Sequence, residues 1–388
     1  MKSDCGVLVM GTSYTGLGLV RGLGRHGIPI WVLGKRLSLA GASRYARRTL
    51  PWPDGPEEQQ VDYLIGLARQ YDLYGWALFP DGDNGAAFIA RHYEELNKYF
   101  RLTVPTWDVL QKAYDKRLTY ALAAKAGVAY PWTCCPSSRS DVEKLDCQFP
   151  LVLKPAHHQG HDLFSIGRGW QVFNRQELLA RYDEACSLVD PSVVLIQEMI
   201  PGGGETQFSF AALCHAGNVL ASVSAQRKRL LPADFGTSAY IETVDKPEIE
   251  VPAKRWLAMA NFTGLVEMDF KFDARDGLYK LLDVNARAWG WHALGPRAGV
   301  DFAFLMWQLA QGNPITPARG RAGVRWVRTA YDLMAALQAM RHGTLSLRDY
   351  ARSLKGAQHE MYALDDFMPA LVEVPLLMHL TWIRISSI

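Results

Sequence analysis

Two neighbouring segments of the chain, residues 266–273 and 280–287, alternate apolar and polar positions as half-buried β-strands do. In the first segment every second residue is Val, Met or Phe, and the residues between them are all charged. The two segments are joined by residues 274–277, which end in Asp-Gly, a strong signal for a hairpin turn. The pattern therefore predicts a β-hairpin with one apolar face and one polar face.

The polar face of this predicted hairpin gathers candidate metal ligands. Asp283, Asn285 and Arg287 share one face of the second strand because they are spaced by two. The hairpin brings Asp269 of the first strand towards them. Two carboxylates and an amide oxygen suit Mg²⁺, which completes its shell with water and substrate phosphates, and an arginine beside them can clamp a phosphate. A hairpin with a merely solvated charged face is an equally weighted alternative.

Apolar runs near the N-terminus predict a separate α/β domain. Residues 5–10 and 28–33 have the composition of buried strands, and they flank a helical pattern over residues 17–26, which makes a βαβ start. A further helix, strand and helix follow, and Pro105 marks a boundary. The pattern predicts a doubly wound domain over residues 1–105.

After this domain the pattern predicts two further units. A helix is expected over residues 113–126, and apolar strands are expected over residues 149–155 and 192–196. Together with the hairpin they form a second unit over residues 106–314. Helical patterns dominate the remainder, so residues 315–388 are expected to form a mostly helical C-terminal appendage.

The glycines after the first predicted strand leave a dinucleotide site open as an alternative. Gly11, Gly16 and Gly18 do not have the G-x-G-x-x-G spacing. The second strand ends in Lys35 and Arg36 instead of an acidic ribose ligand, and these two cations could hold the 2′-phosphate of NADP. In the simpler interpretation the glycines serve only the close packing of strand and helix.

Composition narrows the class of protein without identifying it. The 388 residues are 49% hydrophobic and 21% charged, which is ordinary for a globular chain. The net charge of +3 is too small to indicate nucleic-acid binding. Six scattered cysteines without a C-x-x-C motif indicate a reduced, cytoplasmic protein. The uncharged stretch over residues 374–383 is too short to span a bilayer, so no transmembrane segment is expected.

Several polar residues at predicted strand and helix ends form an ordered set. Lys116 and Lys154 can hold phosphate oxygens as point charges. Gln197 and Glu198 end an apolar strand whose backbone can pair with an adenine edge, and Glu205 follows as a carboxylate that can hold ribose hydroxyls. Each residue taken alone is more simply a surface residue. In this order, ahead of the acidic hairpin, they form the inventory for a nucleoside triphosphate with a metal ion.

With these residues in place, the chain resembles the ATP-grasp superfamily, and in particular the predicted carboxylate–amine ligases of the D-aspartate ligase group. The resemblance covers roughly residues 1–315, and its most specific stretches are Leu282-Asp-Val-Asn-Ala-Arg-Ala-Trp-Gly-Trp-His292 and Val266-Glu-Met-Asp-Phe-Lys271. It implies an α/β fold in which a doubly wound pre-ATP-grasp domain precedes a two-subdomain ATP-grasp fold. ATP is then expected between the two sheets of the ATP-grasp fold.

The resemblance also implies roles for individual residues. The positions that match the family's nucleotide and metal ligands are Lys116 and Lys154 for the phosphates, Gln197, Glu198 and Ile200 for adenine, Glu205 for the ribose, Asp269, Asp283 and Asn285 for the metal ion, and Arg287 for the transferred phosphate. The candidates around the second substrate are Lys228 as a further phosphate or acyl-phosphate ligand, Arg229 and Arg297 as ligands of an acidic substrate, and Trp289 as a wall of its pocket.

Two features depart from the family's pattern. The loop over residues 157–169 should be small and glycine-rich so that it closes over the phosphates, and only its second half is. Asp283 stands where many relatives carry glutamate. His157, His158 and His161 in the same loop suggest zinc as an alternative, but their spacing and the absence of a matching acid or cysteine weigh against it.

The activity that the resemblance implies is an ATP-dependent carboxylate–amine ligation. A carboxylate takes the terminal phosphoryl group of ATP to form an acyl-phosphate, and an amine then displaces phosphate. ATP and Mg²⁺ are the implied cofactors, with Mn²⁺ as an alternative ion, and Arg287, Lys228 and Lys154 are the expected catalytic residues. A non-catalytic ATP-binding protein and an NADP-dependent oxidoreductase stay open as rivals. The identity of the two substrates and a homo-oligomeric state are also left open.

Overall fold

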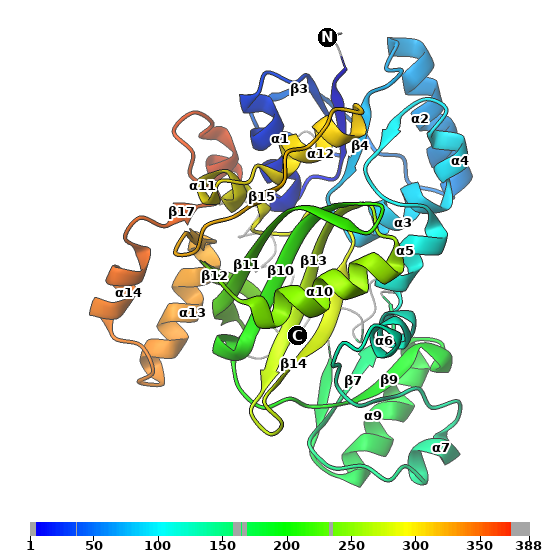
Figure 1. Ribbon diagram of the computed structural model, residues 1–388, viewed down its shortest axis with the longest axis vertical. Coiled ribbons are helices and arrows are strands. Elements are labelled where there is room, and N and C mark those ends of the chain that lie inside the picture. Colours follow the sequence, from blue (N-terminus) through cyan, green and yellow to red (C-terminus); the bar gives the residue numbers. More distant parts are fainter. Residues whose placement is uncertain (1–4, 36, 158–163, 165–168, 233–235, 374–388) are drawn as a thin grey trace.

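The structure is a computed structural model that describes residues 5–35, 37–157, 164, 169–232 and 236–373. Its strands form a parallel five-stranded sheet, a four-stranded sheet and an eight-stranded sheet. Figure 1 shows the five-stranded sheet at one end of the molecule, the eight-stranded sheet in the middle and the four-stranded sheet at the other end.

The five-stranded sheet confirms the predicted doubly wound domain. Its strands, in the order β3-β2-β1-β4-β5, are β1 (Val7–Met10), β2 (Ile30–Leu33), β3 (Ala46–Leu50), β4 (Ala77–Pro80) and β5 (Arg101–Leu102). Its helices are α1 (Tyr14–Arg25), α2 (Glu57–Tyr71), α3 (Asp83–Arg91) and α4 (Tyr93–Leu96). Val7 and Val9 join the core shared with α1, whereas Leu8 and Met10 join the core shared with α2 and α3. Helices therefore cover both faces of the sheet.

The strand order reverses at β1, which places a topological switch point between β1 and β4. In open α/β sheets, ligands bind beyond the carboxyl ends of the strands at such a point. Here the backbone N–H of Ser13 donates to the Asp81 carboxylate at 2.9 Å, so the segments that follow β1 and β4 are tied together. Gly11 has φ +135°, and a Cβ added to it would lie 1.8 Å from the same carboxylate, so only glycine fits there.

The four-stranded sheet forms the smaller half of the predicted second unit. Its strands, in the order β6-β9-β7-β8, are β6 (Thr133–Cys134), β7 (Leu151–Pro155), β8 (Trp170–Val172) and β9 (Val194–Glu198). The helices that complete this half are α7 (Arg139–Glu143) and α9 (Arg175–Leu188), with one 3₁₀ turn over Pro191–Val193. Leu151 and Leu153 pack with these helices, which leaves Lys154 at the end of an otherwise apolar strand.

The eight-stranded sheet carries the hairpin. Its strands are β10 (Gln207–His215), β11 (Asn218–Leu231), β12 (Thr237–Val244), β13 (Gly264–Asp273), β14 (Leu278–Asn285), β15 (Ala318–Arg319), β16 (Arg325–Val327) and β17 (Gln358–His359). Met268 and Phe270 are buried in a core that also contains Trp256 of α10 (Pro247–Ala260). On the polar side Asp269 pairs directly with Asp283 across β13 and β14, so the predicted hairpin is confirmed, and the pairing shifts by one residue between Asp269 and Phe270.

The helix predicted over residues 113–126 is in fact interrupted. Two helices, α5 (Trp107–Tyr114) and α6 (Lys116–Lys125), meet at Asp115, which has extended backbone angles. The Asp115 carboxylate accepts a hydrogen bond from the backbone N–H of Arg117, which is an N-cap interaction. The cap starts a new helix at Lys116 and fixes the direction of that side chain.

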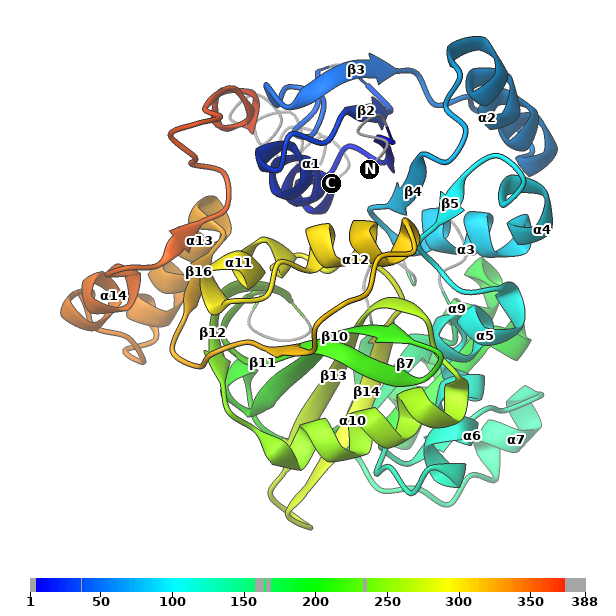
Figure 2. The same ribbon diagram turned by 45° about the horizontal axis from the view of Figure 1, so that its top comes forward.

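The segment after residue 314 is more closely integrated than the predicted appendage. It contains helices α13 (Thr329–Arg341) and α14 (Leu347–Leu354), but β15, β16 and β17 extend the eight-stranded sheet. Before it come a 3₁₀ turn and two helices, His292–Leu294, α11 (Gly295–Ala298) and α12 (Phe302–Ala310). Figure 2 shows α12 between the N-terminal sheet and the eight-stranded sheet, and its core residues are shared with both.

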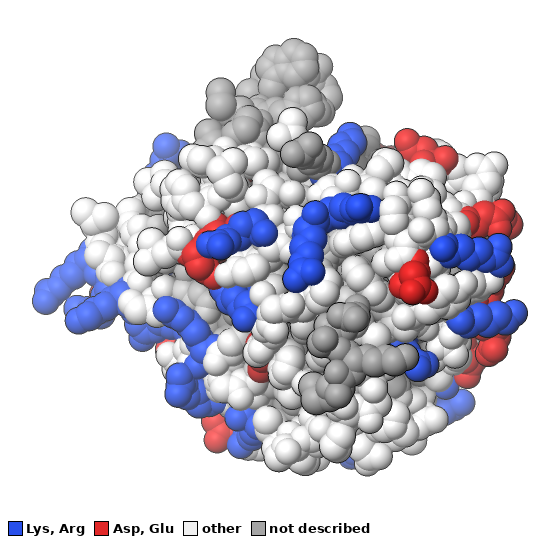
Figure 3. Space-filling view, turned by 90° about the horizontal axis from the view of Figure 1, so that it is seen from above, with Lys and Arg blue, Asp and Glu red and all other residues white. Residues whose placement is uncertain are grey.

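The surface and helix lengths add two observations. Within the described part of the chain, none of the helices has both the length and the apolar character needed to cross a membrane. The apolar stretch over residues 374–383 lies outside the described residues. In the view of Figure 3, Lys and Arg side chains lie among Asp and Glu side chains and wide uncharged areas, rather than in one continuous basic tract.

A stability prediction follows from the base of the hairpin. The buried Asp273 carboxylate accepts from Arg275 at 2.8 Å and from Lys280 at 2.7 Å, and these donors hold its pKa well below its usual range. Asp273 is the buried one of the three carboxylates that pair with Lys280, and it also accepts from Arg275. Asp273→Asn removes its charge from both hydrogen bonds and should lower the free energy of unfolding by about 1.5–3 kcal/mol in a urea titration. Asp276→Asn removes only an exposed partner of the same lysine and should cost about 0.5 kcal/mol or less. Equal losses would contradict this ranking.

Candidate active site

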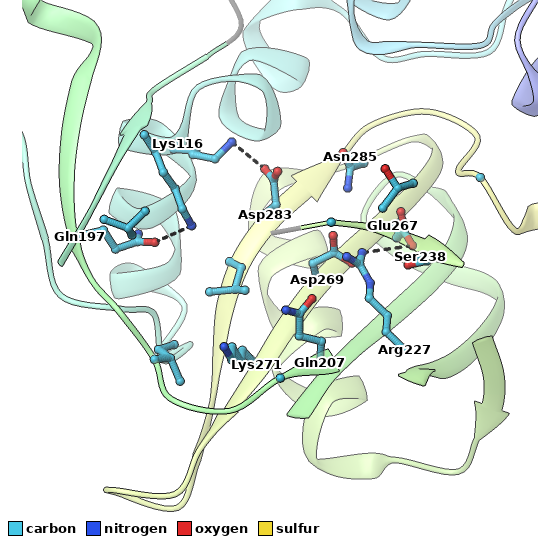
Figure 4. Close-up of a pocket in the computed structure, with 18 of the residues that line it drawn as sticks. Lys116, Gln197, Gln207, Arg227, Ser238, Glu267, Asp269, Lys271, Asp283 and Asn285 are labelled. Atoms are coloured by element: carbon cyan, nitrogen blue, oxygen red, sulfur yellow. Dashed lines mark hydrogen bonds and ion pairs between the residues drawn. The ribbon is translucent and has the colours of Figure 1, made fainter. Parts of the chain in front are cut away.

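A cleft of about 330 Å³ lies between the four-stranded and eight-stranded sheets. Its walls include β7 and β9 on one side and β13 and β14 on the other, and Figure 4 shows charged side chains of both signs around it. Tyr14 and Asp83 also line it, so the switch point of the N-terminal sheet opens onto the same space. The sequence-predicted site residues that line the cleft are Lys116, Lys154, Gln197, Glu198, Ile200, Asp269, Asp283, Asn285 and Arg287.

The acidic residues of the hairpin are each matched by a cation or a donor. Asp269 accepts from Ser209 at 2.7 Å and pairs with Arg227 at 2.5 Å. Asp283 pairs with Lys116 at 3.1 Å, as Figure 4 shows. Because the two carboxylates face each other on adjacent strands, these cations offset the repulsion between them.

The donor set at the hairpin fits a hard cation that takes few protein ligands. Asp269 and Asp283 supply carboxylate oxygens from paired positions, and Asn285 supplies an amide oxygen two residues further along β14. Across the described residues, no group of three or more His, Cys, Asp and Glu side chains is arranged to hold a metal ion. That finding weighs against a closed all-protein site and agrees with Mg²⁺, which keeps water and phosphate oxygens in its shell.

The zinc alternative has little support in the described part of the chain. The ring of His157 stacks on Tyr114 with 5.7 Å between ring centroids. His158 and His161 lie outside the described residues, as does most of the loop over residues 157–169.

Lys154 has the most perturbed lysine environment of the cleft. Its ammonium donates to Gln197 Oε1 at 3.1 Å, and burial, followed by the nearby charge of Lys116, lowers its pKa to about 8. Gln197 is itself oriented by hydrogen bonds from its Nε2 to Tyr120 at 3.0 Å and to Thr133 at 2.9 Å. An anion beside Lys154 would stabilise its ammonium form and restore its positive charge. This environment therefore favours the binding of an anion.

The strand end expected to meet adenine forms one wall of the cleft. Glu198, Met199 and Ile200 all line it. The Glu198 carboxylate accepts from Lys280 at 2.9 Å and from Arg275 at 2.6 Å, so the strand end is tied to the base of the hairpin. Glu205 does not line the cleft: its exposed carboxylate accepts from the backbone N–H of Gly203 at 2.9 Å.

Arg287 lies where the hairpin meets the N-terminal domain. Its guanidinium donates to Asp83 at 3.0 Å and to the Asn285 amide oxygen at 3.0 Å. Burial works against its charge, but the Asp83 carboxylate holds the pKa of Arg287 above its ordinary value. The arginine is thus permanently charged and sits beside the predicted metal ligands.

Besides Glu205, the four residues expected around the second substrate do not line the cleft. Lys228 is exposed, and Trp289 is fully buried against Phe302 at 4.8 Å between ring centroids. Arg229 pairs through two hydrogen bonds with Asp332 of α13, at 2.6 and 2.9 Å. The fourth, Arg297, lines a separate cavity whose walls include α1 and α11.

The strand register explains why Arg229 does not face the cleft, contrary to the prediction. Residues 227 and 229 would share a face in a regular strand, but the pairing of β11 with β12 shifts on both sides of Arg229. Arg227 therefore faces the cleft while Arg229 turns towards α13. An alternating pattern cannot reveal such a bulge in advance.

The sequence pattern did not identify three further cleft residues, Glu267, Arg227 and Asp83. Glu267 is buried, accepts from the Trp291 indole N–H at 2.7 Å, and has its pKa raised to about 7 by burial and by the neighbouring Asp269. Arg227 lies 4.0 Å from it. The period-two pattern already placed Glu267 on the face of Asp269, so this signal was present. Asp83 had no local signal, because its partner lies 204 residues away.

Comparison with solved structures identifies the fold. An L-amino acid ligase from Bacillus licheniformis superposes with a TM-score of 0.63 at 17% identity, covering 80% of this chain and 75% of that one. A Staphylococcus aureus N5-carboxyaminoimidazole synthetase complexed with ADP gives 0.63 at 13% identity, covering 82% and 80%. The Hydrogenobacter thermophilus biotin carboxylase domain, in complex with MgADP and bicarbonate, gives 0.66 at 17% identity, covering 82% and 73%. The chain has the ATP-grasp fold that the sequence indicated.

The sequence comparison is narrower. The chain is 25% identical to the D-aspartate ligase of Enterococcus faecium (strain Aus0004) over 226 residues, which cover 55% of this chain and 53% of that protein. The chain thus matches about half the length of this curated relative. No protein-family model matches the chain. This similarity supports the D-aspartate ligase group named from the sequence motifs. The D-aspartate ligase activity is that of the relative.

The two neighbouring cations of β11 lead to a stability prediction. Arg229→Met leaves the Asp332 carboxylate, which has no exposed side-chain surface, without its ion-pair partner. The substitution should therefore lower the free energy of unfolding by about 3–5 kcal/mol. Lys228→Met, one residue away but exposed, should change it by about 0.5 kcal/mol or less. Urea titrations of both variants test the difference. A stable Arg229→Met protein would show that the ion pair with Asp332 is dispensable.

Proposed function

We propose that this protein is an ATP-dependent carboxylate–amine ligase that acts through an acyl-phosphate and releases ADP and phosphate. The observation that carries the proposal is the pairing of Asp269 with Asp283 across one hairpin, in a cleft that also contains Lys154 and Arg287. This set combines hard-oxygen metal ligands with cations for phosphate. The similarity to D-aspartate ligase supports the same reaction class.

In this proposal the nucleotide lies between the two sheets. Lys116 and Lys154 contact its phosphates, and Gln197, Glu198 and Ile200 meet adenine. Glu205 is proposed for the ribose, which requires its carboxylate to turn from Gly203 towards the cleft. Asp269, Asp283 and Asn285 hold Mg²⁺, or Mn²⁺ in its place. A bound metal ion would neutralise the charge that develops on the transferred phosphoryl group.

The chain's own contribution is positioning and charge compensation. A carboxylate oxygen of the first substrate attacks the γ-phosphorus of ATP, and the bond to ADP breaks, which yields the acyl-phosphate. The amine nitrogen then attacks the acyl carbon, phosphate leaves, and the proton lost by the nitrogen is taken up by phosphate. Arg287 and Arg227 are placed to hold the phosphate oxygens and the substrate carboxylate, in the role first expected of Lys228 and Arg229.

The remaining assignments are also proposals. We place the pre-ATP-grasp domain at residues 1–105, the ATP-grasp domain at 106–314 and the C-terminal appendage at 315–388, of which β15, β16 and β17 extend the large sheet. All six cysteines are free thiols in the structure, which supports the expected cytoplasmic location. A homo-oligomer is kept as a hypothesis for solution measurement.

The test of the proposed function is ADP release. The wild-type protein with MgATP should release ADP when pooled amino acids and simple carboxylic acids are supplied, with an amide product of matching mass. Asp283→Asn should reduce that rate by about a hundredfold or more, because it removes one charge from the metal site without changing volume. Asp276→Asn, on the same hairpin but outside the cleft, should keep the wild-type rate. ATP binding without ADP release in any pool would favour the non-catalytic ATP-binding protein.

A pH prediction follows from Lys154. Phosphate binds the ammonium form, and in the free protein the pKa of Lys154 is about 8. As the pH rises through that value the lysine is neutral before binding, so ATP affinity should fall by about tenfold between about pH 7 and about pH 9. Lys154→Arg stays charged and should bind ATP with little dependence on pH over this range. Calorimetric titration checks both, and an equal pH response in the two proteins would exclude Lys154 as its source.

A further inference from the structure

The ion pair between Arg287 and Asp83 joins the hairpin to the N-terminal domain. Arg287 Nη2 donates to Asp83 Oδ2 at 3.0 Å and to Asn285 Oδ1 at 3.0 Å, and Nη1 donates to the carbonyl oxygen of Ala288 at 3.1 Å. Asp83 is the first residue of α3, beyond the carboxyl end of β4. The arginine is therefore held by a carboxylate from the other side of the cleft.

The two partners of this pair are unequally accessible. The Asp83 side chain keeps 33% of its surface exposed and lines the cleft, whereas that of Arg287 keeps 18%. A molecule in the cleft can thus reach Asp83 while Arg287 is in place. By contrast, the Asp332 carboxylate that pins Arg229 has no exposed side-chain surface.

The cleft that Asp83 lines also contains further carboxylates and aromatic side chains. Glu267, Tyr14, Trp291 and Trp326 line the cleft together with it. Carboxylates favour an ammonium group through charge pairing, and aromatic rings add to this through their negative faces. The Tyr14 ring already carries the Arg328 guanidinium at 4.2 Å from its centroid, so the charge pairing with Asp83 carries the argument. Gly290 keeps the loop close to Tyr14: a Cβ there would lie 2.6 Å from the tyrosine oxygen.

We propose that Asp83 recognises the amine substrate as an ammonium ion, and that this binding releases Arg287 towards the phosphate oxygens. The inference rests on the proposed ligase function and narrows its second substrate to amines that are cationic in solution. A neutral acceptor could not compete with the guanidinium for the Asp83 carboxylate. The bound ammonium gives up one proton to solvent before its nitrogen attacks. Asp83 is thus a substrate-binding residue that also positions Arg287.

A purely structural clasp makes different predictions. If Asp83 only fastened α3 to the hairpin, neutralising it would lower stability without any effect specific to amines. Glu57 provides the matched control, because it pairs with Arg91 at the other end of α3, has similar exposure, and does not line the cleft. Glu57→Gln loosens the same helix while leaving Asp83 intact.

The first experiment measures cation binding directly. n-Butylammonium chloride, with uncharged n-butanol as a control, is titrated into the MgADP-saturated protein and followed by ligand-observed NMR. Wild type and Glu57→Gln should bind n-butylammonium alike, and Asp83→Asn should bind it about tenfold or more weakly. Asp83→Glu, which keeps the charge, should recover part of the affinity. Equal binding by all four proteins, or none by the wild type, would overturn the inference.

The second experiment uses the substrate pools in which the wild type releases ADP. Asp83→Asn should raise the KM for the amine about tenfold or more, leave the KM for ATP unchanged, and release more ADP without amine, because Arg287 is no longer held back. A uniform loss of rate at unchanged amine KM would identify a structural clasp. If the wild type releases no ADP in any pool while n-butylammonium binding still depends on Asp83, the ligase function fails and the cation site stands.

Discussion

The facing pair of carboxylates on the hairpin is the constraint around which the cleft is arranged. Asp269 and Asp283 lie opposite each other on adjacent strands, where two like charges repel strongly unless cations or a metal ion compensate them. Lys116 pairs with one carboxylate and Arg227 with the other. Lys116 belongs to α6 and Arg227 belongs to β11. Charge compensation at the hairpin therefore ties to it a helix and a strand that are not paired with β13 or β14.

The same pairing of carboxylates with cations explains how the cleft can exchange its internal ion pairs for contacts with a metal ion and phosphate groups. Each cation that neutralises a carboxylate is also suited to phosphate, because lysine offers a point charge and arginine a planar pair of donors. A phosphate-bound metal ion would bring both signs of charge at once. The carboxylates would then face the metal and the cations would face the phosphates, with little change in net charge. Such sites can be closely packed and still bind a highly charged ligand.

The sequence revealed those parts of the site that depend on local periodicity. The hairpin follows from a period of two and an Asp-Gly turn, and Lys154 follows from a single charge at the end of an apolar strand. Interactions between distant segments have no such signal. The partner of Arg287 lies in another domain, and the direction of Arg229 depends on a bulge whose position is set by strand pairing. A capping aspartate, Asp115, divided a helix whose apolar pattern seemed continuous.

Two arginines of this chain show why burial of the partner, more than the ion pair itself, indicates function. Arg229 and Arg287 each pair with an aspartate at hydrogen-bond distance. Asp332 has no exposed side-chain surface, so nothing from solvent can replace Arg229 without unfolding α13 from the sheet. Asp83 borders the cleft and keeps a third of its side-chain surface, so a ligand can compete for it. An ion pair is exchangeable only where a competing charge can arrive before the pair breaks, because an isolated buried charge is too costly to serve as an intermediate.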